Sequence, residues 1–222
     1  MNEDKVIIRF ATLKDVDKLT DLHCRSFKPE DHVPMMLGRN YVKASYKWQV
    51  SSELTYVLMA EYDGRLAGLV AVCDRSFTKE MFIACLPELI KSLVIKPRLL
   101  FNKMLWTRLF RSPDTAKGSK SKIGILGFAQ MTIGAVDQSF RGKGIFAELV
   151  QATKECSQRR GSKAIRAGVY KRNQSSRQVF VKSGWNELKE LETTDTVFYA
   201  AFFDKSIAEK FGVKLEFSHS GD

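Results

Sequence analysis

The feature that most constrains this chain is the stretch MTIGAVDQSFRGKGIFAELVQ, residues 131–151, which runs from an apolar strand through a basic glycine turn into an amphipathic helix. Gly142 and Gly144 let the backbone approach a diphosphate closely, and the free amides at a helix start replace water around an anion. Arg141 and Lys143 add positive charge. The pattern therefore predicts a site for a phosphate-containing ligand, although the turn alone also fits a solvated basic loop.

Two other glycine-rich phosphate sites do not match this turn. The P-loop needs the pattern GxxxxGK followed by Ser or Thr, which RGKGIF does not contain. The dinucleotide-binding fingerprint needs three glycines as GxGxxG, and Phe146 and Ala147 stand where the third glycine would be. The strand, turn and helix therefore indicate a different class of phosphate site.

The rest of the chain predicts an α/β fold. We expect strands over residues 5–10, 54–61, 66–73, about 123–136, 164–170 and 196–203. Thr12 is placed to cap a helix over 13–27, and further helices are expected over 35–49, about 142–160 and 174–182. The pair Asp63 and Gly64 predicts a hairpin between the second and third strands.

Residues 77–110 interrupt the strands with a helical pattern, in which Pro87 and Pro97 each stand where a helix can begin. The polar, basic stretch 111–122 that follows is typical of an exposed loop. We therefore expect one domain over residues 1–222, with an inserted basic helical segment and loop over 76–122.

Composition narrows the class of protein. The chain has 222 residues, of which 44% are hydrophobic, and no window is apolar and uncharged over the roughly 20 residues of a bilayer span. The first residues, MNEDKVIIRF, lack the basic leader and apolar stretch of a secretory signal, which predicts a cytoplasmic protein. The four cysteines form no CxxC pair and the three histidines no HExxH motif, so no metal site is expected.

The positive charge is concentrated in the insertion. The net charge is +11, and residues 75–122 hold 11 Lys or Arg against 3 acidic residues, a local +8. A basic surface fits nucleic acid, an anionic membrane or an acidic small molecule. The aromatic residues of the segment follow helical spacing rather than a stacking platform on strands, so nucleic acid is not expected.

Two motifs together resemble the GNAT superfamily of N-acetyltransferases. Its central motif, V-D-x-x-x-R-G-x-G-[IV]-[GA], is matched here by Val136, Asp137, Arg141, Gly142, Gly144 and Ile145, with Phe146 in place of the usual small residue. Its second signature, N-x-x-A-x-x-[LF]-Y-x-x-x-G-[FW], is matched by Asn173, Ser176, Val179, Phe180, Gly184 and Trp185. The two motifs stand in the order and spacing of the family.

The resemblance implies a fold and a cosubstrate. The fold is the GNAT acyl-CoA N-acyltransferase fold of the α/β class, a mixed twisted sheet of about six to seven strands flanked by helices, with the helical insertion between the third and fourth strands. The cosubstrate is acetyl-CoA. The backbone at Gly134 and Val136 would pair with the pantetheine arm. The pyrophosphate would lie on Arg141, Gly142, Lys143, Gly144, Ile145, Phe146 and Ala147, and Asn173, Ser176 and Phe180 would lie beside the arm and thioester.

Two positions depart from the family pattern. Phe180 stands where the family usually has a tyrosine that protonates the leaving thiolate, and a phenyl ring has no proton to donate. Gln130 stands where histone-acetylating members have a glutamate base, and an amide does not accept that proton. Other candidates for catalysis are Glu30, Asp31 and His32 in the first interhelical loop and Tyr170 at the end of a strand, although each also fits a solvated charge or a packing residue.

The sequence therefore predicts an N-acetyltransferase that acetylates the amine of a small molecule, such as an amino sugar or another anionic metabolite. A non-catalytic acyl-CoA-binding module is the alternative that Phe180 and Gln130 favour. The amphipathic insertion fits first a helical cap or a homodimer contact, and as an alternative peripheral contact with an anionic membrane.

Overall fold

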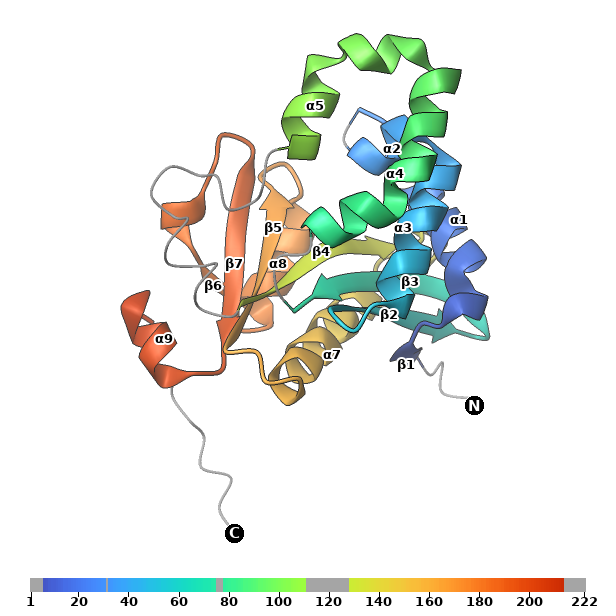
Figure 1. Ribbon diagram of the computed structural model, residues 1–222. Coiled ribbons are helices and arrows are strands. Elements are labelled where there is room, and N and C mark those ends of the chain that lie inside the picture. Colours follow the sequence, from blue (N-terminus) through green and yellow to red (C-terminus); the bar gives the residue numbers. More distant parts are fainter. Residues whose placement is uncertain (1–5, 31, 75–77, 111–127, 214–222) are drawn as a thin grey trace.

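The structure is a computed structural model that describes residues 6–30, 32–74, 78–110 and 128–213, and it is built on one seven-stranded sheet (Figure 1). The strand order is β1-β2-β3-β4-β5-β7-β6. Among the described strands, β4 and β5 pair in parallel and the other neighbouring pairs are antiparallel. The strands are β1 (Val6–Phe10), β2 (Thr55–Tyr62), β3 (Arg65–Cys73), β4 (Phe128–Val136), β5 (Ala164–Tyr170), β6 (Asn186–Glu187) and β7 (Thr196–Phe202). The predicted mixed α/β sheet is confirmed.

Helices cover both faces of this sheet. The α-helices are α1 (Val16–Ser26), α2 (Val33–Leu37), α3 (Arg39–Ser51), α4 (Thr78–Ile95), α5 (Lys103–Phe110), α7 (Ile145–Arg159), α8 (Gln174–Lys182) and α9 (Lys205–Lys210). Short 3-10 turns are η1 (Leu13–Asp15), η2 (Pro97–Phe101), η4 (Gln138–Phe140) and η5 (Lys189–Leu191). Side chains of α1 and α3 share one core cluster with β2 and β3, and those of α7 and α8 share another with the opposite face. Successive residues of β2, such as Val57 and Leu58, therefore belong to different clusters, because side chains along a strand point to opposite faces in turn.

Local residue chemistry explains several boundaries. Asp63 and Gly64 have φ values of 50° and 70°, the double left-handed turn that suits a tight hairpin, so the predicted hairpin is confirmed. Thr12 caps η1 through a capping box with Asp15. The single helix expected over 35–49 is wrong, because Gly38 at φ 105° ends α2 and α3 begins after it.

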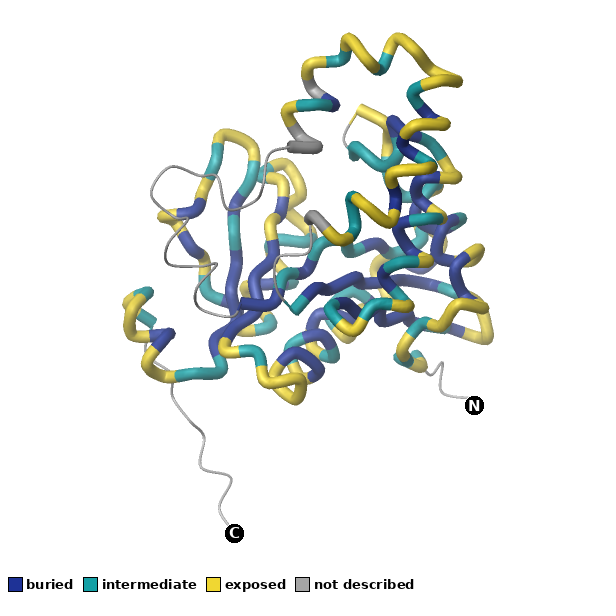
Figure 2. The backbone as a smooth tube through the Cα atoms, in the orientation of Figure 1, coloured by how far each residue is buried: buried dark blue, intermediate teal, exposed yellow. Residues whose placement is uncertain are grey.

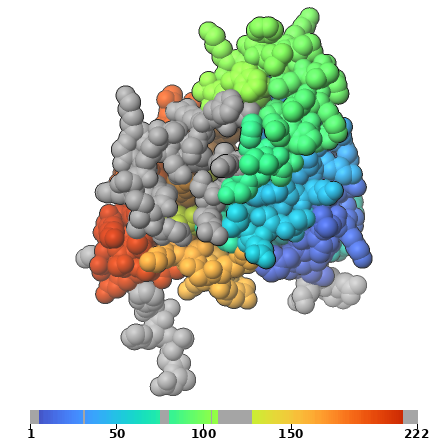
Figure 3. All heavy atoms as spheres, viewed as in Figure 1, coloured from blue at the N-terminus to red at the C-terminus, as the bar shows by residue number. Residues whose placement is uncertain are grey.

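The insertion α4, η2 and α5 lies between β3 and β4 and stands at the upper end of the molecule (Figures 1 and 3). Pro97 begins η2 as expected, but the helix start expected at Pro87 is wrong, because α4 runs through this residue. Pro87 is exposed, and so is Ile83 one turn before it, so the carbonyl that loses its donor lies on the solvent side. The loop 111–122 and the strand start expected at 123–127 lie outside the described residues.

The inner face of the insertion is part of a further core cluster with α2 and α3. Its buried members are Met36, Leu37, Tyr41, Cys85, Leu89 and Leu105. No helix among the described residues is long and apolar enough to cross a membrane. Within the same residues, no three His, Cys, Asp or Glu side chains gather as they would around a metal ion.

Candidate functional site

Strands β4 and β5 separate midway along the sheet. They pair from Phe128 and Ala164 as far as Met131 and Ala167, while β4 continues to Val136. At that point the register between β3 and β4 shifts, which leaves Thr132 as a bulge, and its Oγ1 donates to the Ala71 carbonyl at 3.1 Å. The bulge lets β4 stay paired with β3, while the opposite edge of β4 turns away from β5. Among the described residues, the backbone of 132–136 therefore has no strand partner on the β5 side.

Two cavities occupy this opening. The smaller has a volume of about 290 Å³ and the larger about 530 Å³, and Phe27, Gly134, Phe146, Asn173 and Ser176 line both. They therefore form one groove with two ends. The larger cavity is lined by ten of the residues assigned to the cosubstrate from sequence: Gly134, Val136, Arg141, Gly142, Gly144, Ile145, Phe146, Ala147, Asn173 and Ser176. Phe180 lines the smaller one.

The glycine turn ends the groove at the start of α7. Gly142 and Gly144 have φ values of 81° and 78°, and a Cβ on either would meet no atom within 4 Å. Glycine is therefore required for backbone conformation, and the space beside the turn is open. Gly144 is the N-cap of α7, and its carbonyl accepts from the Ala147 amide at 2.9 Å. The amides before Ala147 have no acceptor within the helix, so this end presents donors to the larger cavity.

The two basic side chains of the turn have different surroundings. Lys143 Nζ donates to the Tyr62 hydroxyl at 2.9 Å and lies 4.3 Å from the centre of that ring. Arg141 is exposed and lines the larger cavity. Lys143 is not among the residues that line either described cavity. Arg141 thus brings a positive charge to the lining of the larger cavity, and Lys143 ties the turn to β2.

Asp137 holds the turn that leads into the glycines. Its carboxylate accepts from the Ser139 amide at 3.0 Å and from Arg25 at 3.0 Å. The Ser139 amide is the larger influence and Arg25 a smaller one, and both lower the pKa of Asp137. The aspartate of the sequence motif therefore has a structural role that links α1 to the end of β4.

An aromatic wall lines the groove where its two ends meet. The ring of Phe146 lies against Gly134 of β4 and meets the ring of Phe180 edge to face, with centroids 5.9 Å apart. Phe180 is 1% exposed and stacks on Tyr199 at 5.5 Å. Phe146 therefore occupies space between β4 and α8 that a small residue would leave empty.

The start of α8 forms the opposite wall. The side-chain oxygen of Asn173 caps this helix by accepting from the Ser176 amide at 3.2 Å. The backbone amide of Asn173 donates to the Tyr170 carbonyl at 2.8 Å. Tyr170 lines the smaller cavity, and the Arg172 guanidinium lies 4.9 Å from its ring centre. The structure thus brings the predicted Tyr170, Asn173 and Ser176 together at the groove.

His32 also reaches the smaller cavity, where it belongs to a chain of hydrogen bonds. Its Nδ1 lies 3.1 Å from His23 Nε2, and His23 Nδ1 lies 2.9 Å from the Tyr46 hydroxyl. Phe27 stacks on the His32 ring at 4.8 Å. His23 is 0% exposed, and this burial, with a smaller influence of His32, lowers the pKa of His23 to about 3. The chain leads from the core of the α1 and α3 layer to the cavity.

His23 and Tyr46 are not among the site residues predicted from the sequence. A signal was present, because His23 lies four residues after Leu19 on the apolar face of α1, where a polar ring needs a partner.

The remaining candidates are placed differently. Glu30 is exposed and lines neither described cavity, and Asp31 lies outside the described residues. The side-chain oxygen of Gln130 accepts from Arg166 at 3.0 Å, and Gln130 lines neither described cavity.

Known structures share this architecture. No protein-family model matches the chain, and no curated protein matches its sequence. The PaiA N-acetyltransferase of Thermoplasma acidophilum, in complex with coenzyme A, superimposes with a TM-score of 0.57 at 11% identity over 90% of this chain and 99% of that one. YncA of Salmonella typhimurium, with its cofactor acetyl-CoA, has a TM-score of 0.54 at 14% identity, covering 90% and 95%.

An acetyltransferase of the GNAT family from Streptococcus pneumoniae has a TM-score of 0.54 at 16% identity, covering 90% of this chain and 100% of that one. At such identities the likeness establishes the fold, which is that of the GNAT acetyltransferases.

Proposed function

We propose that this chain, which has the GNAT fold, is an acetyl-CoA-dependent N-acetyltransferase that acetylates the amine of a small molecule. The observation that carries the proposal is the single groove that joins the open edge of β4 to the amide end of α7. An extended chain with amide groups at one end and a diphosphate at the other fits these two binding surfaces.

The open edge of β4 suits the pantetheine arm. No strand of the described residues pairs with 132–136 on the β5 side, so an arm with amide groups would add to the sheet like a short strand. Gly134 and Val136 both line the larger cavity, in support of their assignment to this contact.

The glycine turn suits the pyrophosphate. Positive φ at Gly142 and Gly144 directs the backbone of the turn into an open space, where helix amides and the charge of Arg141 would bind the anion. Lys143 contributes to this site by holding the turn on Tyr62 rather than by direct contact. Ile145 anchors the start of α7 in the core, since it is 1% exposed.

We assign the acceptor to the smaller cavity, with His32 as the base. Bound acetyl-CoA supplies an activated acyl carbon, which the amine attacks with loss of the thiolate. In our proposal His32 Nε2 takes the amine proton while its Nδ1–H donates to His23 Nε2, and His23 Nδ1–H donates to Tyr46. A buried neutral His23 stabilises the imidazolium that forms on His32.

The departing thiolate must take its proton from a group other than Phe180, whose ring has none to donate. Tyr170 lines the same cavity and carries a hydroxyl, so we propose Tyr170 or water in this role. Glu30 and Asp31 remain weaker candidates for the acceptor side, since Glu30 lines neither described cavity.

A second candidate function is an acyl-CoA-binding module without catalysis. The specific observation in its favour is the aromatic wall, in which Phe180 replaces a proton donor and Phe146 a small residue.

One experiment separates the two functions. Both functions predict that acetyl-CoA raises the melting temperature and that acetate does not. At a hundredfold excess over Kd, acetyl-CoA should raise the free energy of unfolding by about 2.7 kcal/mol. Only the enzyme releases free thiol from acetyl-CoA when a panel of small amines is added. The absence of a thermal shift in folded protein at millimolar acetyl-CoA would refute both functions, and a shift without thiol release across the panel would favour the binding module.

A further inference from the structure

Helix α4 has two apolar faces, and the described residues cover one of them. Cys85 and Leu89 point inward and belong to the cluster with α2 and α3. Ile83, Leu86, Ile90 and Val94 recur at helical spacing on the other side and are exposed. A surface helix of an ordinary soluble domain would carry polar residues on that second face, so the outer stripe needs a partner.

The stripe ends in a protruding apolar turn, which we call the insertion tip and define as Val94, Ile95, Leu100 and Phe101. Phe101 is 86% exposed, and Val94 and Ile95 are each 75% exposed. Figure 2 shows this turn in the colour of exposed residues at the upper end of the molecule. Large apolar side chains are seldom so exposed together in a soluble protein, which indicates an interaction surface.

The tip is held in place by polar contacts behind it. Trp106 Nε1–H donates to the Leu100 carbonyl at 2.8 Å, and Lys96 Nζ donates to the Met36 carbonyl at 3.3 Å. The apolar side chains are therefore presented outward by a fixed turn.

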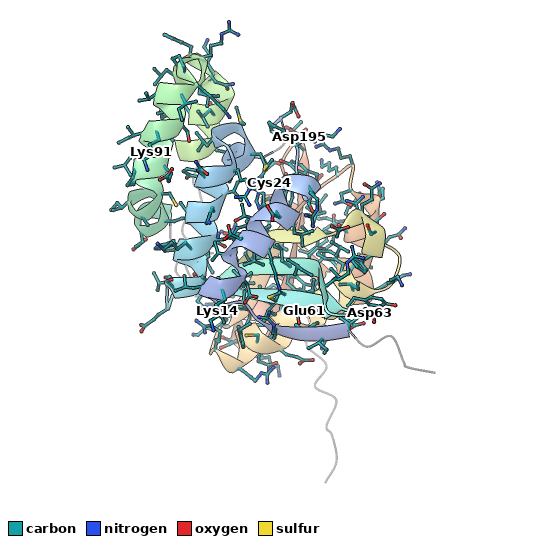
Figure 4. All side chains as sticks on the ribbon, turned by 90° about the vertical axis from the view of Figure 1, so that its right-hand side faces the viewer. Lys14, Cys24, Glu61, Asp63, Lys91 and Asp195 are labelled. Atoms are coloured by element: carbon teal, nitrogen blue, oxygen red, sulfur yellow. The ribbon has the colours of Figure 1, made fainter. Side chains whose placement is uncertain are left out.

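Basic residues flank the tip along the chain. Lys91, Lys96, Arg98 and Lys103 are exposed, and residues 91–103 contain no acidic residue. Lys91 is paired with Glu88 at 2.6 Å. Figure 4 places Lys91 on the insertion and Lys14 at the opposite end of that view. Cations around protruding apolar groups match a layer of anionic headgroups over acyl chains, at about 1 kcal/mol for each Lys or Arg near the surface.

We infer that the insertion tip docks this protein on an anionic lipid bilayer as a peripheral anchor that does not span it. A bilayer accepts a convex apolar turn without a preformed pocket, whereas a protein partner would need a complementary concave surface. The outer stripe of α4 would extend the contact along the headgroup boundary, and the stems of the lysines would reach back to the phosphates.

The insertion that carries the tip packs on the helix that begins after His32. Helix α2 packs against both α4 and α5, and its N-cap is His32, which lines the smaller cavity. If the proposed function holds, an amine at the membrane surface is the acceptor class that this arrangement favours. The docking itself does not depend on acetyl transfer, so the two proposals can fail separately.

The test is co-sedimentation of the full chain with vesicles. We expect binding to vesicles in which about a third of the lipid is phosphatidylglycerol, weaker binding as salt rises from about 0.1 M to about 0.5 M, and little binding to phosphatidylcholine alone. Ile95→Ser with Phe101→Ser should weaken binding on the order of tenfold or more. Arg98→Glu with Lys103→Glu should weaken it mainly at low salt.

Matched controls change similar residues elsewhere. Ile7 and Val181 are 54% and 59% exposed, so Ile7→Ser with Val181→Ser replaces two exposed apolar side chains outside the insertion. Lys14→Glu with Lys18→Glu reverses two exposed charges on η1 and α1. Both controls should bind vesicles like the parent. Failure of the parent to bind anionic vesicles, equal losses in tip and control variants, or a parent dimer that the tip variant dissociates without any vesicle binding would each overturn the proposal.

Discussion

The ring of Phe146 occupies the space into which a side chain at position 134 would extend. Its Cε2 lies 2.9 Å from where a Cβ on Gly134 would be, closer than real Cβ contacts allow. Gly134 is also the β4 residue at which the two ends of the groove meet. The glycine at position 134 of β4 therefore leaves the space that the Phe146 ring of α7 fills.

This pairing predicts a coupled effect on stability. Gly134→Ala should lower the free energy of unfolding by about 1 to 3 kcal/mol, because the added methyl group displaces the Phe146 ring. In a Phe146→Ala background the same change should cost much less, and urea denaturation of the four proteins gives the coupling energy. Additive losses would mean that the ring does not lie against Gly134.

The glycine turn predicts that backbone geometry matters more than the lysine charge. Gly144→Val should weaken coenzyme A binding strongly, because a branched residue at φ 78° strains the turn and fills the open space beside its amides. Lys143→Ala should weaken it little, since Lys143 contacts Tyr62. Isothermal titration calorimetry measures both affinities.

Gly161 provides the matched control for that experiment. It has φ 79° and an equally open surrounding at the far end of α7. Gly161→Val should therefore carry a similar strain cost in stability and leave coenzyme A affinity unchanged. Equal loss of affinity in Gly144→Val and Lys143→Ala would show that the turn binds coenzyme A through its positive charge and not through its backbone geometry.

Phe180 predicts different outcomes for two substitutions. Phe180→Ala should cost about 3 to 5 kcal/mol of stability, because the ring is fully buried against Tyr199 and Phe146, and it should also loosen acetyl-CoA. Phe180→Tyr should bind acetyl-CoA about as well as the parent and leave turnover equal or higher. Unchanged affinity and stability in Phe180→Ala would show that the second motif is misaligned.

His23 predicts a dependence of stability on pH. Its folded pKa of about 3 lies below the ordinary value of 6.5, so the unfolded chain binds the proton first and stability is lost as pH falls from about 6.5 towards 3. The loss is about 1.4 kcal/mol per pH unit, or about 2 kcal/mol between pH 6.5 and 5, before most carboxylates titrate. Urea denaturation should show a flatter slope in His23→Gln, whatever its stability at pH 7. An unchanged slope would contradict a buried neutral His23.

His32 predicts a loss of turnover without a loss of cosubstrate binding. His32→Gln should lower kcat by about 10²- to 10⁴-fold once an acceptor is known, because general base catalysis typically contributes that much. The thermal shift with acetyl-CoA should remain, since the larger cavity holds most of the proposed cosubstrate contacts and His32 does not line it. Glu30→Gln is the control and should keep turnover near that of the parent. A larger loss in Glu30→Gln than in His32→Gln would reverse the assignment.

The sequence alone determined those features that depend on neighbouring residues. The hairpin at Asp63 and Gly64 follows from the left-handed conformation that these residues tolerate, and the glycine turn before α7 from the same preference. The bounds predicted for β5 and α8, 164–170 and 174–182, agree with the structure because strand and helix periodicity change there abruptly.

Only the tertiary structure decided which distant residues meet. Lys143 turns to Tyr62 because β2 lies beside the start of α7, and His23 reaches His32 because α1 and α2 fold back over one sheet face. The separation of β4 and β5 depends on a bulge at Thr132. No local sequence pattern predicts this bulge, since Thr132 fits a regular strand equally well. These contacts join residues through packing across elements, and local periodicity carries no information about which elements become neighbours.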